Sequence, residues 1–268
     1  MKAIEIFSHL KEKGTWVNWN RTCDEFLCGD PETEVKGVAV AWMTSFSNLK
    51  KAHELGCNLF ITHEALYAGF GNEYGVYSAH NVLLEEDDPW VEKGKWLEEK
   101  GMVVFRCHDV WDDFPEIGIH GAWAKFLGFT GKPAKLVKFY EVHEVEARLF
   151  GDIVNQVLEH VKDIGQEAVL YMGDLDDEVS SVAFGTGAIT NYRVMHQLGA
   201  DVLILTDDGM NFCEVCHWAE DTGNKLIIVN HATAEEPGMR QLAGYLQKEF
   251  PSVPVKAIER GCLYKVKC

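Results

Sequence analysis

Long uncharged apolar segments are missing from this chain of 268 residues. No uncharged run approaches the roughly 18 apolar residues that a membrane-spanning helix needs. The first residues, MKAIEIFSHLKEKG, carry acidic and polar side chains within their apolar pattern, which is typical of an amphipathic helix and not of a signal peptide. We therefore expect a globular, cytoplasmic protein without a membrane partner.

Positive charge is scarce as well: 25 Lys and Arg residues stand against 42 Asp and Glu residues, which gives a formal net charge of −17. Such a surface repels the phosphate backbone of nucleic acids, so general nucleic-acid binding is not expected unless a local basic patch overrides the total charge. Clustered acidic side chains attract divalent cations instead.

The eight cysteines are scattered, and a cytoplasmic protein keeps its thiols reduced, so we expect no disulfides. One segment, Cys213-Glu214-Val215-Cys216-His217, matches the C-x-x-C-H pattern of covalent haem attachment. Haem attachment requires export, so we interpret this segment as part of an amphipathic helix that packs against the rest of the protein. Zinc binding through the same cysteines stays open as a minor alternative.

Short apolar runs alternate with helical patterns along the chain. This alternation favours an α/β architecture. After a loop at 16–33, we expect strands at 35–43, 59–61, 102–107, 136–142, 168–172, 179–184, 201–205 and 225–230. We expect helices at 1–14, 45–55, 79–100, 117–127, 150–164, 189–198, 210–220 and 235–250, and a loop around the glycines at 69, 71 and 75.

The sequence contains an internal repeat. AHELGCNLFITHE (52–64) resembles MHQLGADVLILTDD (195–208), and each is followed by a glycine, an apolar strand and a histidine, in GMVVFRCH (101–108) and GNKLIIVNH (223–231). The repeat predicts two related lobes, at approximately 1–130 and 131–268, that could meet and pool the polar residues at their strand ends.

Candidate ligands for a metal ion follow several of these strands. His63 and Glu64 end one strand and His108 the next, while His231 and Glu235 lie four residues apart, a spacing that lets both side chains face one point. Each has an ordinary alternative explanation, such as a half-buried histidine or a carboxylate at a helix N-terminus. Taken together, mixed imidazole and carboxylate ligands suit Zn, Mn, Fe or Mg ions.

Five segments resemble motifs of the Nif-three-like proteins (NGG-interacting-factor-three homologues), a family of dinuclear metal-centre proteins also called GTP cyclohydrolase type 1, type 2 homologues. The resemblance covers most of the chain. The matching segments are ITHEALYAG (61–69), FRCHDVWDD (105–113), GTGAITN (185–191), LTDDGMNF (205–212) and VNHATAEEPGMRQLA (229–243), of which the last is the most specific.

The resemblance implies that His63, Asp112, His231 and Glu235 bind metal. Glu64 stands where the family usually has a second metal-binding histidine; a glutamate still ligates, but it changes the charge and the metal preference of the site. The proline that usually follows is replaced by Ala65.

The second motif opens with His108, for which the resemblance implies a role beside the metals or facing the substrate. Asp109-Val110 replaces the family's Thr-Asn in that motif. The resemblance further implies two interlinked lobes with two divalent metal ions between them and a toroidal homohexamer. The segment 128–180 is too short for the inserted middle domain of longer family members.

The function that we predict is that of a divalent-metal-dependent hydrolase. Two ions would lower the pKa of a bound water, and an unused carboxylate, Glu64 or Glu235, would take its proton as general base. By analogy with the family, the substrate is a nucleotide or another small phosphorylated or heterocyclic compound. The alternative is a metal-binding regulatory or scaffold homo-oligomer that has no catalytic activity.

Overall fold

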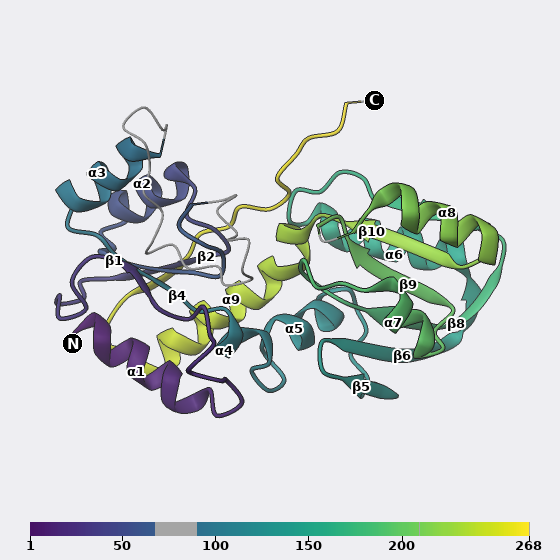
Figure 1. Ribbon diagram of the computed structural model, residues 1–268, viewed down its shortest axis with the longest axis horizontal. Coiled ribbons are helices and arrows are strands. Elements are labelled where there is room, and N and C mark those ends of the chain that lie inside the picture. The colour runs from purple at the N-terminus through teal and green to yellow at the C-terminus, as the bar shows by residue number, and fades with distance from the viewer. Residues whose placement is uncertain (68–89, 209, 268) are drawn as a thin grey trace. The chain divides into compact units, whose positions relative to one another are not determined.

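The structure is a computed structural model that describes residues 1–67, 90–208 and 210–267 (Figure 1). The chain forms two compact units: unit 1 comprises 1–114 and 239–260, and unit 2 comprises 115–238 and 261–268. Because the chain passes from one unit to the other at 114–115, 238–239 and 260–261, the two units are interlinked. The expected glycine loop and the first part of the helix expected at 79–100 lie outside the described residues.

Unit 1 contains a five-stranded sheet with the strand order β1-β4-β3-β2-β11. Strands β4, β3, β2 and β11 run parallel, and β1 pairs with β4 in the antiparallel direction. The strands are β1 (Phe26–Cys28), β2 (Val38–Ala41), β3 (Leu59–Thr62), β4 (Val103–Arg106) and β11 (Val255–Ala257). Since Thr62 is in register with Arg106, the residues that follow β3 and β4 start from the same edge of the sheet.

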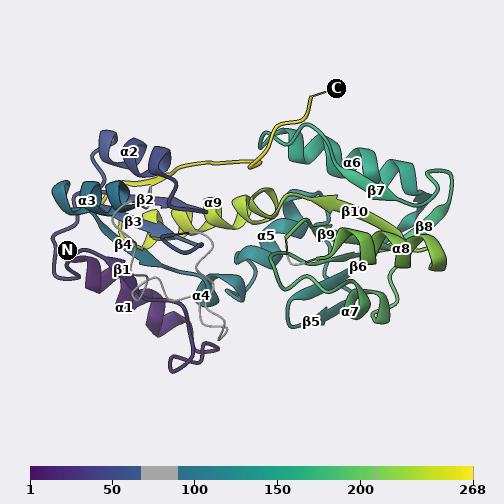
Figure 2. The same cartoon turned by 45° about the horizontal axis from the view of Figure 1, so that its top comes forward.

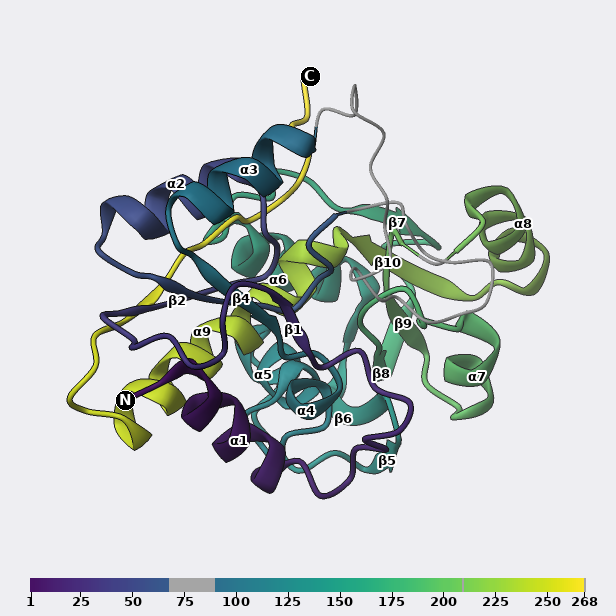
Figure 3. The ribbon, with the colours of Figure 1, turned by 60° about the vertical axis from the view of Figure 1, so that its left-hand side comes forward.

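Helices cover both faces of this sheet. In Figures 1 and 3, α2 and α3 lie over one face, and α1, α4 and the unit 1 part of α9 lie over the other. All residues of β2, β3 and β4 are buried, as expected for parallel strands that are covered on both sides. The helices are α1 (Ala3–Lys13), α2 (Phe46–Glu54), α3 (Val91–Glu99), α4 (Asp109–Asp112) and α9 (His231–Glu249).

Unit 2 contains a six-stranded mixed sheet with the order β5-β6-β8-β9-β10-β7, in which β8, β9 and β10 run parallel. One face packs on α5 and α6 and the other on α7 and α8 (Figure 2). The strands are β5 (Lys135–Val137), β6 (Tyr140–Leu149), β7 (Leu170–Met172), β8 (Glu178–Phe184), β9 (Val202–Thr206) and β10 (Lys225–Val229). The helices are α5 (Ile119–Phe126), α6 (Phe150–Lys162), α7 (Tyr192–Gln197) and α8 (Phe212–Thr222).

The two units repeat one arrangement. In unit 1, β2, α2, β3, α3 and β4 follow each other along the chain, and their three strands are parallel neighbours. In unit 2, β8, α7, β9, α8 and β10 do the same. The expected α/β fold with two related, interlinked lobes is therefore confirmed. Among the described residues, no helix is both long and apolar enough to cross a membrane.

Local patterns mispredicted several elements. The segment expected to be a loop at 16–33 contains β1, and the single strand expected at 136–142 is the hairpin β5-β6, which turns at Lys138 with a φ of 47°. The last helix begins at His231, four residues before the expected start at Glu235. The His231 backbone N–H donates to the carboxylate of Asp207 (2.9 Å), which follows β9, so the sequence around His231 cannot indicate this cap.

The C-x-x-C-H segment lies on α8, as expected, and its buried residue is Val215. Val215 and Ala219 are the buried residues of this helix, whereas Cys213 is exposed and Cys216 is half-buried. His217 is 74% exposed and pairs with Asp221 at 3.2 Å. The thiols of six described cysteines are free: Cys23, Cys28, Cys57, Cys107, Cys213 and Cys216.

Candidate metal centre

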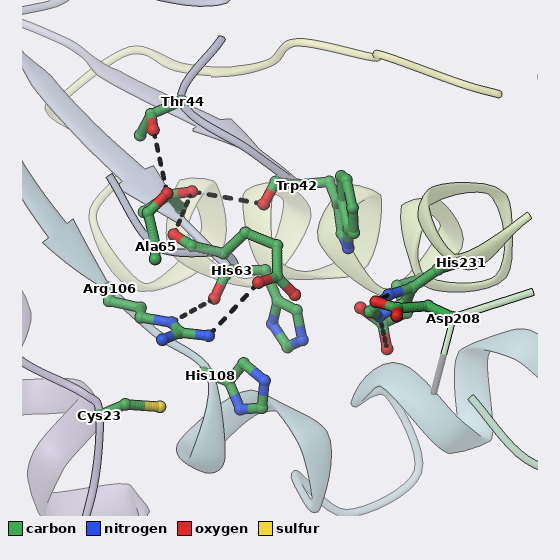
Figure 4. Close-up of polar contacts among 12 residues, drawn as sticks. Cys23, Trp42, Thr44, His63, Ala65, Arg106, His108, Asp208 and His231 are labelled. Carbon is green, nitrogen blue, oxygen red and sulfur yellow. Dashed lines mark hydrogen bonds and ion pairs between the residues drawn. The ribbon is translucent and has the colours of Figure 1, made fainter. Parts of the chain in front are cut away.

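A first group of imidazole and carboxylate side chains follows β3 and β4 in unit 1 (Figure 4). We call His63, Glu64, His108 and Asp112 the unit 1 cluster. The rings of His63 and His108 are stacked, with centroids 4.2 Å apart and planes 12° apart. Asp112 contacts both rings, because Oδ1 lies 3.4 Å from His63 Nε2 and Oδ2 lies 3.1 Å from His108 Nδ1.

The hydrogen bonding of His63 defines which of its nitrogens faces the carboxylate. His63 is fully buried, and its Nδ1 lies 3.3 Å from the carbonyl oxygen of Cys107. A carbonyl oxygen accepts hydrogen bonds and cannot donate, so Nδ1 carries the proton. In the neutral ring, Nε2 then presents its lone pair toward Asp112, as in many metal-bound histidines.

Glu64 is held by a buried arginine that the sequence analysis did not single out. The Arg106 Nε donates to the backbone carbonyl of His63 at 2.7 Å, and Nη2 lies 3.5 Å from Glu64 Oε2 (Figure 4). The backbone N–H of Glu64 donates to the Trp42 carbonyl at 2.9 Å. Arg106, on β4, therefore fixes the first two residues after β3 and partly compensates the charge of Glu64.

His108 lies between two carboxylates. Burial opposes its charged form, but the nearby Asp112 and its hydrogen bonds with Asp109 and Asp112 outweigh burial and raise the pKa of His108 well above its ordinary value. Burial also opposes ionisation of Asp109, yet the hydrogen bond with His108 brings the pKa of Asp109 down to about 2. The two side chains thus favour an imidazolium–carboxylate pair, with Nδ1 and Oδ1 separated by 3.1 Å.

A second group, the unit 2 cluster, consists of Asp208, His231 and Glu235. Asp208 follows β9, and its Oδ2 lies 3.0 Å from His231 Nδ1 (Figure 4). One helical turn along α9, Glu235 places Oε1 3.1 Å from His231 Nε2. His231 and Glu235 are buried, whereas the Asp208 side chain is 59% exposed. One imidazole is thus placed between two carboxylates.

The glycine-rich turn after β8 lies directly against this second cluster. Gly187 has a φ of +74°, which favours glycine. A Cβ at this position would lie 3.0 Å from Glu235 Oε1 and 3.4 Å from His231 Nε2. Thr190 and Thr206 both donate to the Gly187 carbonyl at 2.8 Å. The two threonines therefore hold the turn through the Gly187 carbonyl, and the Gly187 Cα faces the His231–Glu235 pair.

Six of the candidate residues lie together in two groups. His63, Glu64, His108 and Asp112 gather within unit 1, and His231 and Glu235 gather within unit 2. Their roles as metal ligands, and the expected position of the metals between two lobes, remain predictions. Three contributing residues were not singled out: Arg106, Asp208 and Asp24, whose carboxylate accepts the backbone N–H groups of Asp109 and Val110. The sequence does indicate Asp208, since it lies in Thr206-Asp207-Asp208 at the end of a predicted strand.

The fold and these clusters define a class of protein: two interlinked α/β units that carry histidines and carboxylates at the ends of parallel strands. The family model described as Duf34/NIF3 (NGG1p interacting factor 3) matches residues 25–261. The chain therefore belongs to the Duf34/NIF3 family, and the resemblance inferred from the motifs is confirmed.

Several solved structures share this fold. A Bacillus cereus protein related to NIF3 has a TM-score of 0.77 at 14% identity, covering 100% of this chain and 99% of that one. The Staphylococcus aureus hypothetical protein SA1388 has a TM-score of 0.73 at 17% identity, covering 100% and 99%. Reduced HcgD from Methanocaldococcus jannaschii has a TM-score of 0.71 at 18% identity, covering 97% and 98%. At these identities the likeness establishes the fold alone. No curated protein matched the chain.

Proposed function

We propose that this protein binds divalent metal ions through His63, Glu64, Asp112, His231 and Glu235 and uses them to hydrolyse a nucleotide or another small phosphorylated or heterocyclic compound. The observation that carries the proposal is the shared arrangement of two histidines. In each, Nδ1 contacts an oxygen acceptor, and Nε2 points at a buried or nearly buried carboxylate.

This arrangement favours a cation. If Nδ1 of His231 donates to Asp208, the neutral ring presents the Nε2 lone pair to Glu235 Oε1 at 3.1 Å. Two lone pairs facing each other at this distance repel, and either a proton or a metal ion removes the repulsion. A metal ion that binds here takes the place of the proton. Metal-binding histidines commonly donate their other ring N–H to a carboxylate or a carbonyl oxygen, which fixes the ring. The same argument holds for His63, with the Cys107 carbonyl as acceptor.

The ligand types also define the class of metal. Imidazole and carboxylate groups suit Zn, Mn and Fe, and carboxylates also suit Mg. When bound, such ions supply a water that ionises near neutral pH and a Lewis acid for an electrophilic carbon or phosphorus. Hydrolysis then requires a general base, for which we propose whichever of Glu64 and Glu235 is left unused as a ligand. His108, paired with Asp109 and Asp112, is proposed to hold a proton beside the reacting group.

The first test is the metal content of untagged protein by elemental analysis, compared with that of Glu64→His and His231→Ala. We expect about two equivalents per chain in the wild type, the number that a dinuclear centre requires, and loss of metal in His231→Ala. A content of about one that rises to two in Glu64→His would mean that Glu64 has disabled one site. Metal-free protein in all three forms would contradict the proposal.

The second test separates hydrolysis from a scaffold role. Metal-loaded protein is incubated with a panel of nucleotides and phosphoesters, and His231→Ala serves as the inactive control. Turnover that depends on His231 supports the hydrolase. Metal binding without turnover of any panel member would favour the regulatory or scaffold alternative, for which the expected homohexamer is measured by light scattering.

A further inference from the structure

We propose that Cys23, His108 and Asp109 form a separate binding site for a thiophilic divalent cation such as Zn²⁺ or Cd²⁺. This site, which we call the Cys23 site, uses none of the five ligands proposed above. It shares His108 with the proposed function, and a cation bound here would displace the proton that His108 holds there. All three residues belong to unit 1 and lie where the segment before β1 meets the residues after β4.

The three side chains bring three different donor atoms together. Each offers one ligand atom, and these atoms all lie within 4.8 Å of one another. The Cys23 thiol donates to Asp109 Oδ1 at 3.7 Å, and His108 Nδ1 lies 3.1 Å from the same oxygen. A sulfur, an imidazole nitrogen and a carboxylate oxygen form a donor set that zinc accepts, and the sulfur adds a preference for soft ions over Mg²⁺ or Ca²⁺.

The backbone that carries these groups is fixed by a buried carboxylate. Asp24 accepts hydrogen bonds from three successive backbone N–H groups: from His108, from Asp109 at 3.0 Å and from Val110 at 2.8 Å. On the other side of Asp24, the Glu25 carbonyl accepts the Arg106 N–H at 2.8 Å. The Cys23 backbone is thereby held beside the start of α4 before any ion arrives, which lowers the cost of assembling the site.

Solvent reaches the Cys23 site. The side chains of His108 and Asp109 are 26% and 36% exposed, and Cys23 is half-buried. By contrast, the neighbouring Cys107 is buried, so solvent does not bring an ion to this second sulfur. Three protein ligands and access for solvent leave a coordination position for water or another small ligand.

A cadmium titration tests the Cys23 site directly, because Cd²⁺ bound to a thiolate gives an ultraviolet charge-transfer band. The wild type is compared with Cys23→Ser and with the matched control Cys213→Ser, whose cysteine lies on α8 in the C-x-x-C-H segment. We expect the band in the wild type and in Cys213→Ser, and its loss in Cys23→Ser. A band that persists in Cys23→Ser and disappears in Cys213→Ser would overturn the proposal.

A second measurement needs no cysteine variant. Alkylation of Cys23 in the wild-type protein is followed by peptide mass mapping, with and without Zn²⁺. We expect Zn²⁺ to slow the alkylation of Cys23 at least tenfold. In Asp109→Asn, the Zn²⁺ concentration needed for this protection should rise by about 10–100-fold, as metal affinities commonly fall when the ligand shell is changed. Equal alkylation rates with and without Zn²⁺ would refute the Cys23 site.

The two proposals fail separately. His231→Ala is expected to lose the metal of the proposed hydrolytic centre and to keep the cadmium band of Cys23. If the band persists in His231→Ala while elemental analysis shows no resident metal in the purified wild type, the Cys23 site stands and the proposed function falls.

Discussion

The imidazole rings of His63 and His108 are stacked at 4.2 Å, although they follow different strands and lie 45 positions apart in the sequence. The parallel pairing of β3 with β4 explains this contact, since Thr62 and Arg106 are in register. Asp112 lies one turn along from His108 and contacts both rings. Any change in the charge of Asp112 therefore affects two histidines at once.

We predict that Asp112→Asn weakens metal binding at least tenfold, as loss of a carboxylate near a metal commonly does. The amide keeps the shape of the side chain but removes the negative charge that faces both rings. Isothermal titration with Zn²⁺ or Mn²⁺ measures the effect. Asp113→Asn, at the next and exposed position, is the matched control and should bind metal like the wild type. Equal affinities in both variants would exclude Asp112 as a ligand.

Asp208 provides a test of how His231 is oriented. We expect Asp208→Asn to lower metal affinity by about tenfold or more, because a carboxylate on Nδ1 orients the ring and makes Nε2 a better ligand. The control is Asp221→Asn, which removes the carboxylate of another carboxylate–histidine pair, the exposed pair Asp221–His217. The free energy of unfolding without metal should change little in either variant, since both carboxylates are mainly exposed. Unchanged affinity in Asp208→Asn would contradict the proposed orientation.

The glycine-rich turn gives a third prediction. Gly187→Ala places a methyl group 3.0 Å from Glu235 Oε1 and requires a left-handed backbone, which costs about 1–2 kcal/mol. Gly223→Ala has the same backbone strain, with a φ of +68°, but its Cβ meets no atom within 4 Å. Both variants should unfold at lower denaturant concentration, and only Gly187→Ala should also lose metal affinity. If the two variants bind metal equally, the turn does not shape the unit 2 cluster.

A buried lysine predicts how stability depends on pH. Burial lowers the pKa of Lys93 from 10.5 to about 8. Its ammonium donates to the Leu66 carbonyl and lies 3.3 Å from Thr44 Oγ1, so it anchors the segment after Glu64.

Between about pH 8 and 10.5 the unfolded chain holds the proton of Lys93 and the folded protein does not, so the free energy of unfolding rises with pH in this window. The rise is on the order of 2 kcal/mol. Denaturant unfolding across this range should show it in the wild type and in the exposed control Lys95→Met, but not in Lys93→Met. A rise that persists in Lys93→Met would assign it to other groups.

The sequence alone predicts the parallel cores of both units well. β3, β4, β9 and β10 are short apolar runs that each follow a glycine and are followed by a histidine or an aspartate, and the internal repeat relates the two pairs. The residues that follow these strands are the candidate ligands, because parallel strands in register place their carboxyl ends at one edge. His63, His108 and His231 could therefore be identified before the structure was known.

The residues that hold these ligands in place could not be identified from the sequence, because they contact residues that are distant along the chain. The Asp24 carboxylate accepts a hydrogen bond from the backbone N–H of His108, 84 positions away in the sequence. The Asp207 carboxylate accepts one from the backbone N–H of His231, 24 positions away. A local pattern assigns such acids to solvent-exposed loops. The buried Arg106 was likewise hidden within an apolar strand, where its contact with Glu64 depends on the pairing of β3 with β4.

The chain path has a consequence for synthesis on the ribosome. The strands of the unit 2 sheet all lie within 135–229, whereas the unit 1 sheet has its edge strand β11 at Val255–Ala257, paired with β2 more than 200 positions earlier. During synthesis, all strands of the unit 2 sheet are therefore made before β11, the last strand of the unit 1 sheet. Until β11 emerges, the edge of β2 stays open to other strands, and chaperone binding would matter most in that interval.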